Sequence, residues 1–231
     1  MNTHLRPLLL LVSIVLATIP AFTQLDPATD LQHAEMKSAS RQQLIQTLET
    51  RETGSNFDIH YERMDWAIDP AVNFIQGTVT TYFTALDALD RLDFDFNSGL
   101  TIDSIVYHGL TQSDFVQLES QILEIGLPKV IASGQSDSIS ISYHGVPTGG
   151  GFGYWVQSNH QGTPIIWTLS EPYGASSWWP CKQDLSDKID SMDILVTTPN
   201  AYRVASNGLL MDVTPVSDTM SRHHWQTHYP I

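Results

Sequence analysis

Apolar and polar residues alternate with a period of two through most of the chain after Phe57, and this alternation constrains the fold more than any other feature. It is typical of half-buried β-strands, in which successive side chains point to opposite faces. Turn-forming residues interrupt the pattern at intervals of roughly ten residues, as in antiparallel sandwiches and unlike βαβ units. The clearest apolar series are Met64, Trp66 and Ile68; Leu92, Phe94 and Phe96; and Ile139, Ile141 and Tyr143. The sequence therefore predicts an all-β fold, an antiparallel β-sandwich.

Shorter stretches of similar composition predict additional strands. They cover residues 75–79, 115–118, 122–125, 165–169, 194–197, 203–206 and 223–227. No internal repeat or low-complexity tract divides them, which predicts one continuous β-rich domain over residues 57–231. Residues 25–56 precede it as a leader, where the composition of residues 30–52 predicts a short N-terminal helix or a loosely packed solvated segment.

The first 24 residues have the layout of a secretory signal peptide. Arg6 precedes an apolar run over residues 8–19, and Pro20 is followed by Ala21, Phe22 and Thr23. The run is short for a membrane-spanning helix, although an uncleaved membrane anchor is the alternative. We therefore expect cleavage near Gln24, no stable membrane span afterwards, and a secreted, periplasmic or cell-surface location.

Charge and cysteine content exclude one class of binding partner and one way of stabilising the fold. The chain has 11 Lys and Arg against 25 Asp and Glu, a formal net charge of -14. It therefore lacks the clustered cations that nucleic-acid binding requires. Cys181 is the only cysteine, so no intrachain disulfide can form. We interpret this residue as a small buried hydrophobe rather than a nucleophile.

Patterns for catalysis or metal binding do not occur in the sequence. The chain has no His-Glu-x-x-His zinc motif and no Gly-x-Ser-x-Gly nucleophile motif. Adjacent His223 and His224 would point to opposite faces of a strand, so they are poorly placed to share an ion. Four acids recur every third residue without the order of a calcium loop, and we interpret them as solvated. They are Asp184, Asp187, Asp190 and Asp193.

Residues 167–193, the signature segment, are the strongest functional clue in the sequence. Glu171 is followed by Pro172 and Gly174, which place its carboxylate on a bend that cannot continue a regular helix. An aromatic pair and a proline then lead into Cys181. We therefore expect the carboxylate beside a large apolar surface, where it either binds a ligand or braces the turn.

The signature segment resembles that of the N-terminal domains of aminopeptidase N-type zinc metallopeptidases, the gluzincins: an acid, an aromatic residue followed by Pro-Cys, and a further acid. Weaker resemblances follow the family's order at residues 58–61, 68–70, 77–79 and 204–208. The resemblance implies a saddle-like β domain with a loop that reaches into the active-site cleft. It implies that Glu171 binds the free α-amine of a peptide substrate. Leu169 stands where many members carry a glutamine that helps line the pocket for the first substrate side chain.

The family also carries motifs that this chain lacks. A Gly-Ala-Met-Glu-Asn exopeptidase motif and a zinc-binding helix follow the N-terminal domain in the family, and neither occurs here. The resemblance thus implies that the zinc of the full-length enzyme is held by the chain's own catalytic domain downstream. We expect this chain to be a non-catalytic fragment, with the rest of its last strand beyond Ile231 and an exposed sheet edge.

A secreted, non-catalytic β-sandwich binding module, for example for carbohydrate, is the alternative function. Tryptophans supply apolar stacking platforms, and the candidates are Trp155, Trp167, Trp178 and Trp179. Core packing explains the same tryptophans equally well. A His-Glu-x-x-His helix encoded within roughly the next hundred residues would favour the peptidase.

Overall fold

The computed structural model describes residues 53–148, 153–170, 173–184 and 187–229. Strands dominate this part, with one 3-10 helix, η1 (Ala175–Ser177). The strands are β1 (Phe57–Ala67), β2 (Ile75–Ala85), β3 (Leu89–Asp95), β4 (Thr101–Tyr107), β5 (Leu110–Gln112), β6 (Phe115–Leu118), β7 (Ile122–Ile131), β8 (Ser136–Gly145), β9 (Val156–His160), β10 (Thr163–Trp167), β11 (Ser191–Pro199), β12 (Leu209–Pro215) and β13 (Met220–Thr227). The predicted signal peptide and N-terminal helix lie outside the described residues. Within these residues, no helix has the length and apolar character needed to cross a membrane.

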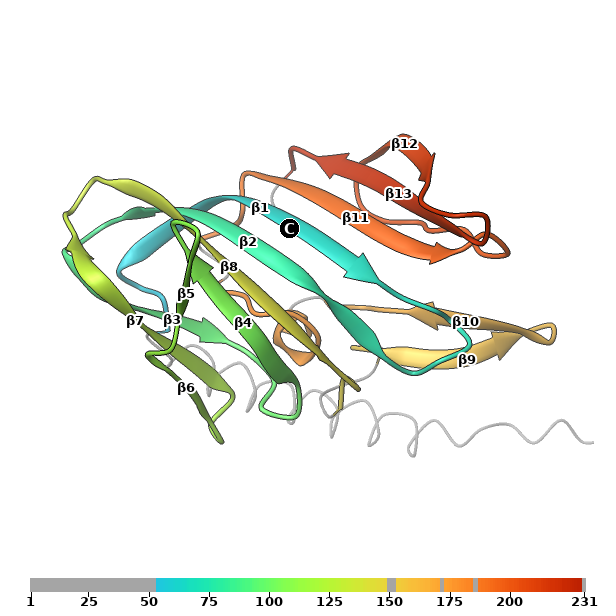
Figure 1. The fold of residues 1–231 in the computed structure, drawn as a ribbon, viewed down its shortest axis with the longest axis horizontal. Coiled ribbons are helices and arrows are strands. Elements are labelled where there is room, and N and C mark those ends of the chain that lie inside the picture. The colour runs from blue at the N-terminus through green and yellow to red at the C-terminus, as the bar shows by residue number, and fades with distance from the viewer. Residues whose placement is uncertain (1–52, 149–152, 171–172, 185–186, 230–231) are drawn as a thin grey trace, which may run out of the picture. The chain divides into compact units, whose positions relative to one another are not determined.

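The strands form three sheets (Figure 1). The largest has eight strands in the order β12-β13-β11-β1-β2-β8-β4-β5, the second has the order β3-β7-β6, and the third is the β10-β9 hairpin. Among these strands, β1 and β11 pair in parallel and all other pairs are antiparallel. The predicted all-β class is confirmed. The parallel pair departs from a purely antiparallel sandwich and needs a long crossover, which here contains β2 to β10.

A β-bulge in β1 decides which of its side chains face the interior. Ile59 is buried, but the register with β2 shifts between Ile59 and Tyr61. Because side chains alternate along a strand, the extra residue moves the inward-facing positions from odd to even numbers. Glu62 is consequently buried on the same face as Met64 and Trp66.

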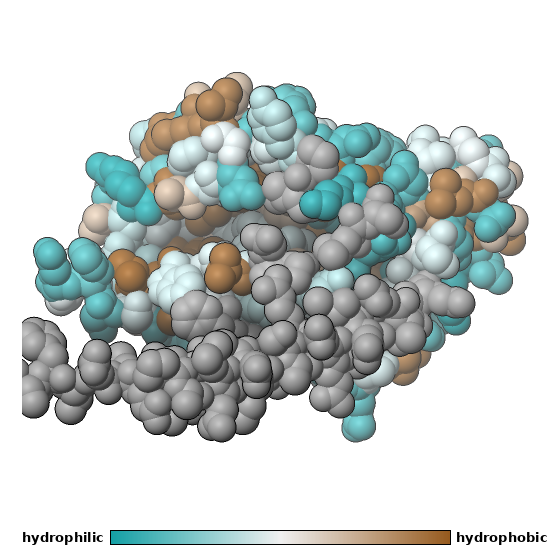
Figure 2. Space-filling view, turned by 180° about the vertical axis from the view of Figure 1, so that it is seen from behind, coloured by the Kyte–Doolittle hydropathy of each residue, from teal (hydrophilic) through white to brown (hydrophobic). Residues whose placement is uncertain are grey.

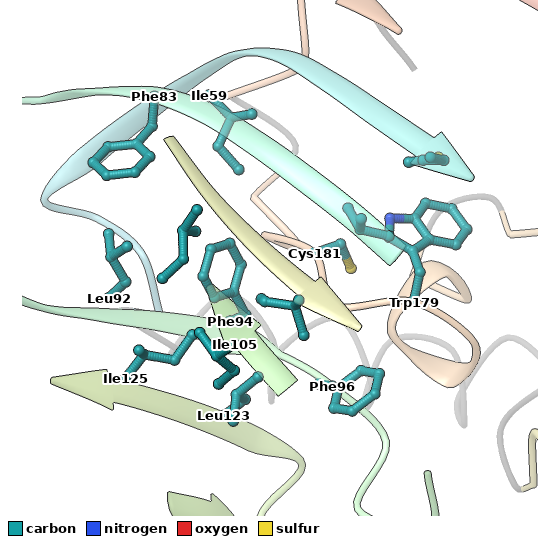
Figure 3. Close-up of a cluster of buried hydrophobic side chains, with 14 of the residues drawn as sticks. Ile59, Phe83, Leu92, Phe94, Phe96, Ile105, Leu123, Ile125, Trp179 and Cys181 are labelled. Atoms are coloured by element: carbon teal, nitrogen blue, oxygen red, sulfur yellow. The ribbon is translucent and has the colours of Figure 1, made fainter. Parts of the chain in front are cut away.

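The main core lies between the three-stranded sheet and the inner face of the eight-stranded sheet. Figure 3 shows apolar side chains from both sheets meeting there. The ring centroid of Phe57 lies 5.6 Å from that of Phe83 and 5.7 Å from that of Phe94. Phe96 makes an edge contact with Tyr143 at 5.2 Å. Such aromatic contacts add to the hydrophobic stabilisation that the buried area provides.

Most of the strand predictions are confirmed. The three clearest alternating series overlap β1, β3 and β8, and the shorter stretches 75–79, 115–118, 122–125, 194–197 and 223–227 lie in β2, β6, β7, β11 and β13. The stretch 165–169 overlaps β10. The prediction of a strand at 203–206 is wrong, because these residues run as irregular chain with Val204 packed against the core. Sequence alternation misses the neighbouring β12, since all seven of its residues are exposed.

Candidate functional site

The chain on either side of Glu171 is tied together by a backbone hydrogen bond. Glu171 and Pro172 lie outside the described residues, so the amine-binding role stays a prediction. The N–H of Gly174 donates to the carbonyl of Ser170 at 2.6 Å. A Cβ at Gly174 would lie 2.5 Å from the ring of Tyr154, so the ring leaves no room for a side chain there. The two flanks of Glu171 are therefore held at a fixed separation.

Trp66 of β1 joins the signature segment to the large sheet. Its ring centroid lies 4.8 Å from that of Trp178 and 6.1 Å from that of Trp179. Its Nε1 donates to the hydroxyl of Tyr143 at 2.9 Å, and that hydroxyl donates to the carbonyl of Trp178 at 2.7 Å. Trp178 in turn donates from Nε1 to Oγ of Ser170 at 3.0 Å. Hydrogen bonds to the backbone and from the side chain of Trp178 thus link β1, through Tyr143, to Ser170 on the flank of Glu171.

Cys181 and Lys182 join the segment to the two sheets. The backbone of Cys181 exchanges hydrogen bonds with that of Asp95 at 3.0 and 2.8 Å, and the thiol side chain is buried, as predicted. Lys182 Nζ donates to the carbonyl of Phe57 at 2.6 Å and to the carboxylate of Asp187. The Lys182 side chain is 3% exposed. Asp187 is therefore half of a largely buried ion pair, and the interpretation of this acid as solvated is wrong.

A hollow of about 610 Å³ lies beside the segment and is bordered by both flanks of Glu171. Figure 2, the view from behind, shows a hollow with apolar surface inside it. Leu169 lines the hollow and is 45% exposed; its role in binding a side chain stays a prediction. Asn207 also lines it, so the structure brings the stretch 204–208 next to the signature segment. The apolar lining includes Met64, Trp66, Trp178, Trp179, Met192 and Ile194.

The turn Ser206-Asn207-Gly208 requires glycine at its last position. Gly208 has a φ of +89°, in the region that L side chains rarely adopt. A Cβ there would also lie 2.0 Å from the backbone oxygen of Gln226 in β13. The turn therefore passes directly against the backbone of β13, and this path places Asn207 beside the hollow.

Gly208→Ala is expected to lower the free energy of unfolding by at least about 2 kcal/mol, because it combines unfavourable φ with a backbone clash. Urea denaturation followed by tryptophan fluorescence measures this loss. Gly134→Ala is the matched control, since Gly134 has a φ of +79° but open space around its Cβ position. Equal losses in the two variants would show that the clash at Gly208 is relieved without cost.

Glu62 is a buried carboxyl in this region that the sequence-based prediction missed. Its side chain is 0% exposed, Oε1 accepts a hydrogen bond from Thr81 Oγ1 at 3.0 Å, and Oε2 has no partner among the described residues. Burial raises the pKa of Glu62 to about 8, against the opposing effect of the Thr81 hydrogen bond. The sequence does carry a signal for it. The odd-numbered apolar series that ends at Ile59 and the even-numbered series from Met64 conflict in phase, which indicates a bulge between them.

The two adjacent histidines of β13 point to opposite faces, as predicted. His223 is buried, whereas the ring of His224 contacts Asp193 at 2.8 Å and Asp212 at 3.3 Å. The hydrogen bond with Asp193 raises the pKa of His224. Across the residues that the structure describes, no group of three or more His, Cys, Asp or Glu could hold a metal ion.

The tryptophans considered as sugar platforms do not form a free stacking surface. Trp178 packs against the core and Trp179 is 8% exposed. The ring centroid of Trp155 lies 5.6 Å from that of Trp178, and its Nε1 donates to the side-chain oxygen of Asn73 at 2.8 Å. Trp167 is 37% exposed. The packing of Trp178 and Trp179 removes the main support for the carbohydrate alternative.

Comparison with known proteins yields matches to solved structures. No protein-family model and no curated protein matches the chain. An M1 zinc metallopeptidase from Deinococcus radiodurans matches with a TM-score of 0.68 and 22% identity, over 76% of this chain and 40% of that chain. A mutant from the same organism bound to a Tyr-Ser-Ala substrate matches with a TM-score of 0.67, 22% identity and the same coverage.

A two-domain M1 zinc metallopeptidase mutant bound to L-arginine gives a TM-score of 0.67 at 23% identity, again over 76% of this chain and 40% of that chain. The chain thus spans 40% of the length of these matched structures. At this identity the likeness concerns the fold. The chain has the fold of the corresponding part of the M1 zinc metallopeptidases.

Proposed function

We propose that this chain is the N-terminal, substrate-binding domain of an exported zinc aminopeptidase that removes residues from the N-termini of peptides. The observation that carries the proposal is the fold match to M1 zinc metallopeptidases, two of them bound to a peptide and to an amino acid. The position of the hollow supports it, because both flanks of Glu171 border a partly apolar cavity. The signal-peptide layout of the first 24 residues supports export.

Glu171 anchors the free amine of the substrate in this proposal. An ammonium that leaves water for a closed cleft needs a fixed carboxylate partner. The hydrogen bond between Ser170 and Gly174 fixes the chain on either side of that carboxylate. Leu169 would contact the first substrate side chain with its exposed apolar surface. An enzyme that binds the amine in this way acts at peptide N-termini.

Zinc belongs to the complete enzyme in this proposal, held by a catalytic domain downstream of this chain. The metal supplies the Lewis acid and activated water of peptide hydrolysis. The residues that the structure describes contain no group of three or more His, Cys, Asp or Glu side chains that could hold a metal ion. This chain would bind and orient the substrate, and would not hydrolyse peptides alone.

Glu171→Gln in the complete enzyme is expected to weaken binding of a free-amine dipeptide by about 2–5 kcal/mol, the cost of removing one partner of a buried charge pair. Competitive inhibition measures the dissociation constants of the dipeptide and of its N-acetylated form. The N-acetylated form carries no ammonium, so its affinity should change little.

Glu119→Gln is the matched control, because it removes one negative charge from an exposed position between β6 and β7. It should leave both affinities unchanged. Equal weakening of the free and acetylated dipeptides by Glu171→Gln would contradict an amine anchor and favour a role in bracing the turn.

A further inference from the structure

The carboxyl of Glu62 is buried on the same face of β1 as Trp66, whose ring packs against Trp178 and Trp179 of the Trp-Trp segment (residues 173–184). Thr81 of β2 donates to its Oε1. From β8, Tyr143 is close enough to interact electrostatically with Glu62, and so is Cys181 of the Trp-Trp segment. Tyr143 also donates to the carbonyl of Trp178. Glu62 is thus enclosed by the sheet on one side and by this segment on the other.

A negative charge on Glu62 has no counterion among the described residues of this enclosure. Thr81 supplies one neutral hydroxyl, and Oε2 has no partner among the described residues. Burial raises the pKa values of Tyr143 and Cys181 well above their usual range, so both stay neutral. Asp95, buried on β3, adds a further acid beside Cys181. An ionised carboxylate is therefore tolerated there only if water reaches it.

The Trp-Trp segment is the part of the enclosure that has no ladder of strand hydrogen bonds. β1 and β2 lie inside the eight-stranded sheet with hydrogen-bonded neighbours on both sides, so the sheet cannot open locally without losing ladder bonds. The segment has no such ladder and is held by separate contacts: the bridge between Asp95 and Cys181, hydrogen bonds of Asn97 with Ser176 and Ser177, and the side-chain contacts of Trp178 and Lys182. Water would reach Glu62 by displacement of this segment.

We propose that Glu62 is a proton-dependent latch that holds the Trp-Trp segment closed while its carboxyl is protonated. When the proton leaves to solvent, the segment opens and water hydrates the carboxylate. The latch is a property of this chain and goes beyond its proposed part in substrate binding. If that function also holds, opening would displace one flank of Glu171.

The direction of the pH effect follows from proton linkage. The closed state binds the Glu62 proton more tightly than the open state, with a pKa of about 8 against the ordinary value of 4.5. Between these values opening releases one proton, so the equilibrium constant for opening rises about tenfold per pH unit. The rise levels off above the closed-state pKa, and closure is fully favoured at acid pH.

Alkylation of Cys181 by iodoacetamide reports this opening in the full 231-residue chain, because Cys181 is the only cysteine and is buried. The rate at each pH is divided by that of a free-thiol peptide, which removes the intrinsic dependence on thiolate. We expect the normalised rate to rise about tenfold per unit between pH 5.5 and 7.5 and to level off above pH 8. Glu62→Gln should abolish this dependence, and Glu119→Gln should retain it.

A normalised rate that is flat in the wild-type chain, or that rises equally in Glu62→Gln, would overturn the latch. So would a parallel rise in the amide hydrogen-exchange rate of β7 after division by the intrinsic exchange rate at each pH, since that would mean global unfolding. If Glu62→Gln fails to fold, Thr81→Val tests the same idea. It removes the donor that favours the charged form, so the plateau should move to higher pH. No peptide enters these measurements, so their outcome is separate from that of the Glu171 experiment.

Discussion

Lys182→Met is expected to lower the free energy of unfolding by about 3–5 kcal/mol, because it leaves a largely buried carboxylate without its counterion. Methionine keeps most of the apolar stem and removes the ammonium, which lies 5.3 Å from the ring centroid of Phe57 and donates to the Phe57 carbonyl. Removal of the ammonium also leaves the repulsion among the neighbouring acids unopposed. A hydrogen bond with Asp187 raises the pKa of Asp58, and Lys182 opposes that rise. Urea denaturation at pH 7 measures the effect.

A double-mutant cycle with Asp187→Asn isolates the ion pair from the packing of the stem. The double variant should recover part of the lost free energy of unfolding, because it has neither the ammonium nor the carboxylate and so buries no unpaired charge. The loss should also shrink at a pH low enough to protonate the carboxylates. A total cost under about 1 kcal/mol would mean that the pair behaves like an exposed salt bridge, and would argue against its role in anchoring the signature segment.

Trp66→Ala is expected to cost a similar amount, about 3–5 kcal/mol, through loss of buried area and an unfilled cavity. Trp66 is buried against Trp178 and Trp179, and it supplies the hydrogen bond to Tyr143. The same substitution should loosen the segment around Cys181. Thermal and urea unfolding measure the first effect, and thiol alkylation measures the second.

Trp66→Phe separates the hydrogen bond from the volume of the ring. It keeps an aromatic side chain and removes the Nε1 donor, so we expect a smaller loss of about 1–2 kcal/mol. Trp167→Ala is the matched control at a more exposed tryptophan and should cost much less than Trp66→Ala. If Trp66→Ala cost no more than this control, Trp66 would not be the link between β1 and the signature segment.

The candidate site was predictable from sequence as a segment but not as a set of contacts. Pro172, Gly174 and the aromatic pair before Cys181 mark residues 167–193 because regular strands or helices do not require them. One of the two partners of Lys182, in contrast, is the carbonyl of Phe57, 125 residues away. Backbone acceptors carry no sequence signal. Asp187 could therefore be mistaken for a solvated acid when only the local pattern was considered.

The hollow has the same dependence on tertiary structure. Leu169 and Asn207 come from separate stretches, and they meet because β11 pairs with β1 and the turn at Gly208 follows. The missing alternation in β12 has a related cause. Both faces of that edge strand are exposed, so packing against a core imposed no pattern on it.

The sequence by itself determined the all-β class, most of the strands, the burial of Cys181 and the opposite faces of His223 and His224. These follow from local rules, since a strand alternates its side chains and a half-buried sheet imposes that period on composition. The tertiary structure decided the parallel pairing of β1 with β11, the pairing of Lys182 and the burial of Glu62. Those features depend on which strands become neighbours and on where a bulge changes which side chains of a strand face the core. Such choices are set by the free energy of the whole core, which no local stretch of residues encodes.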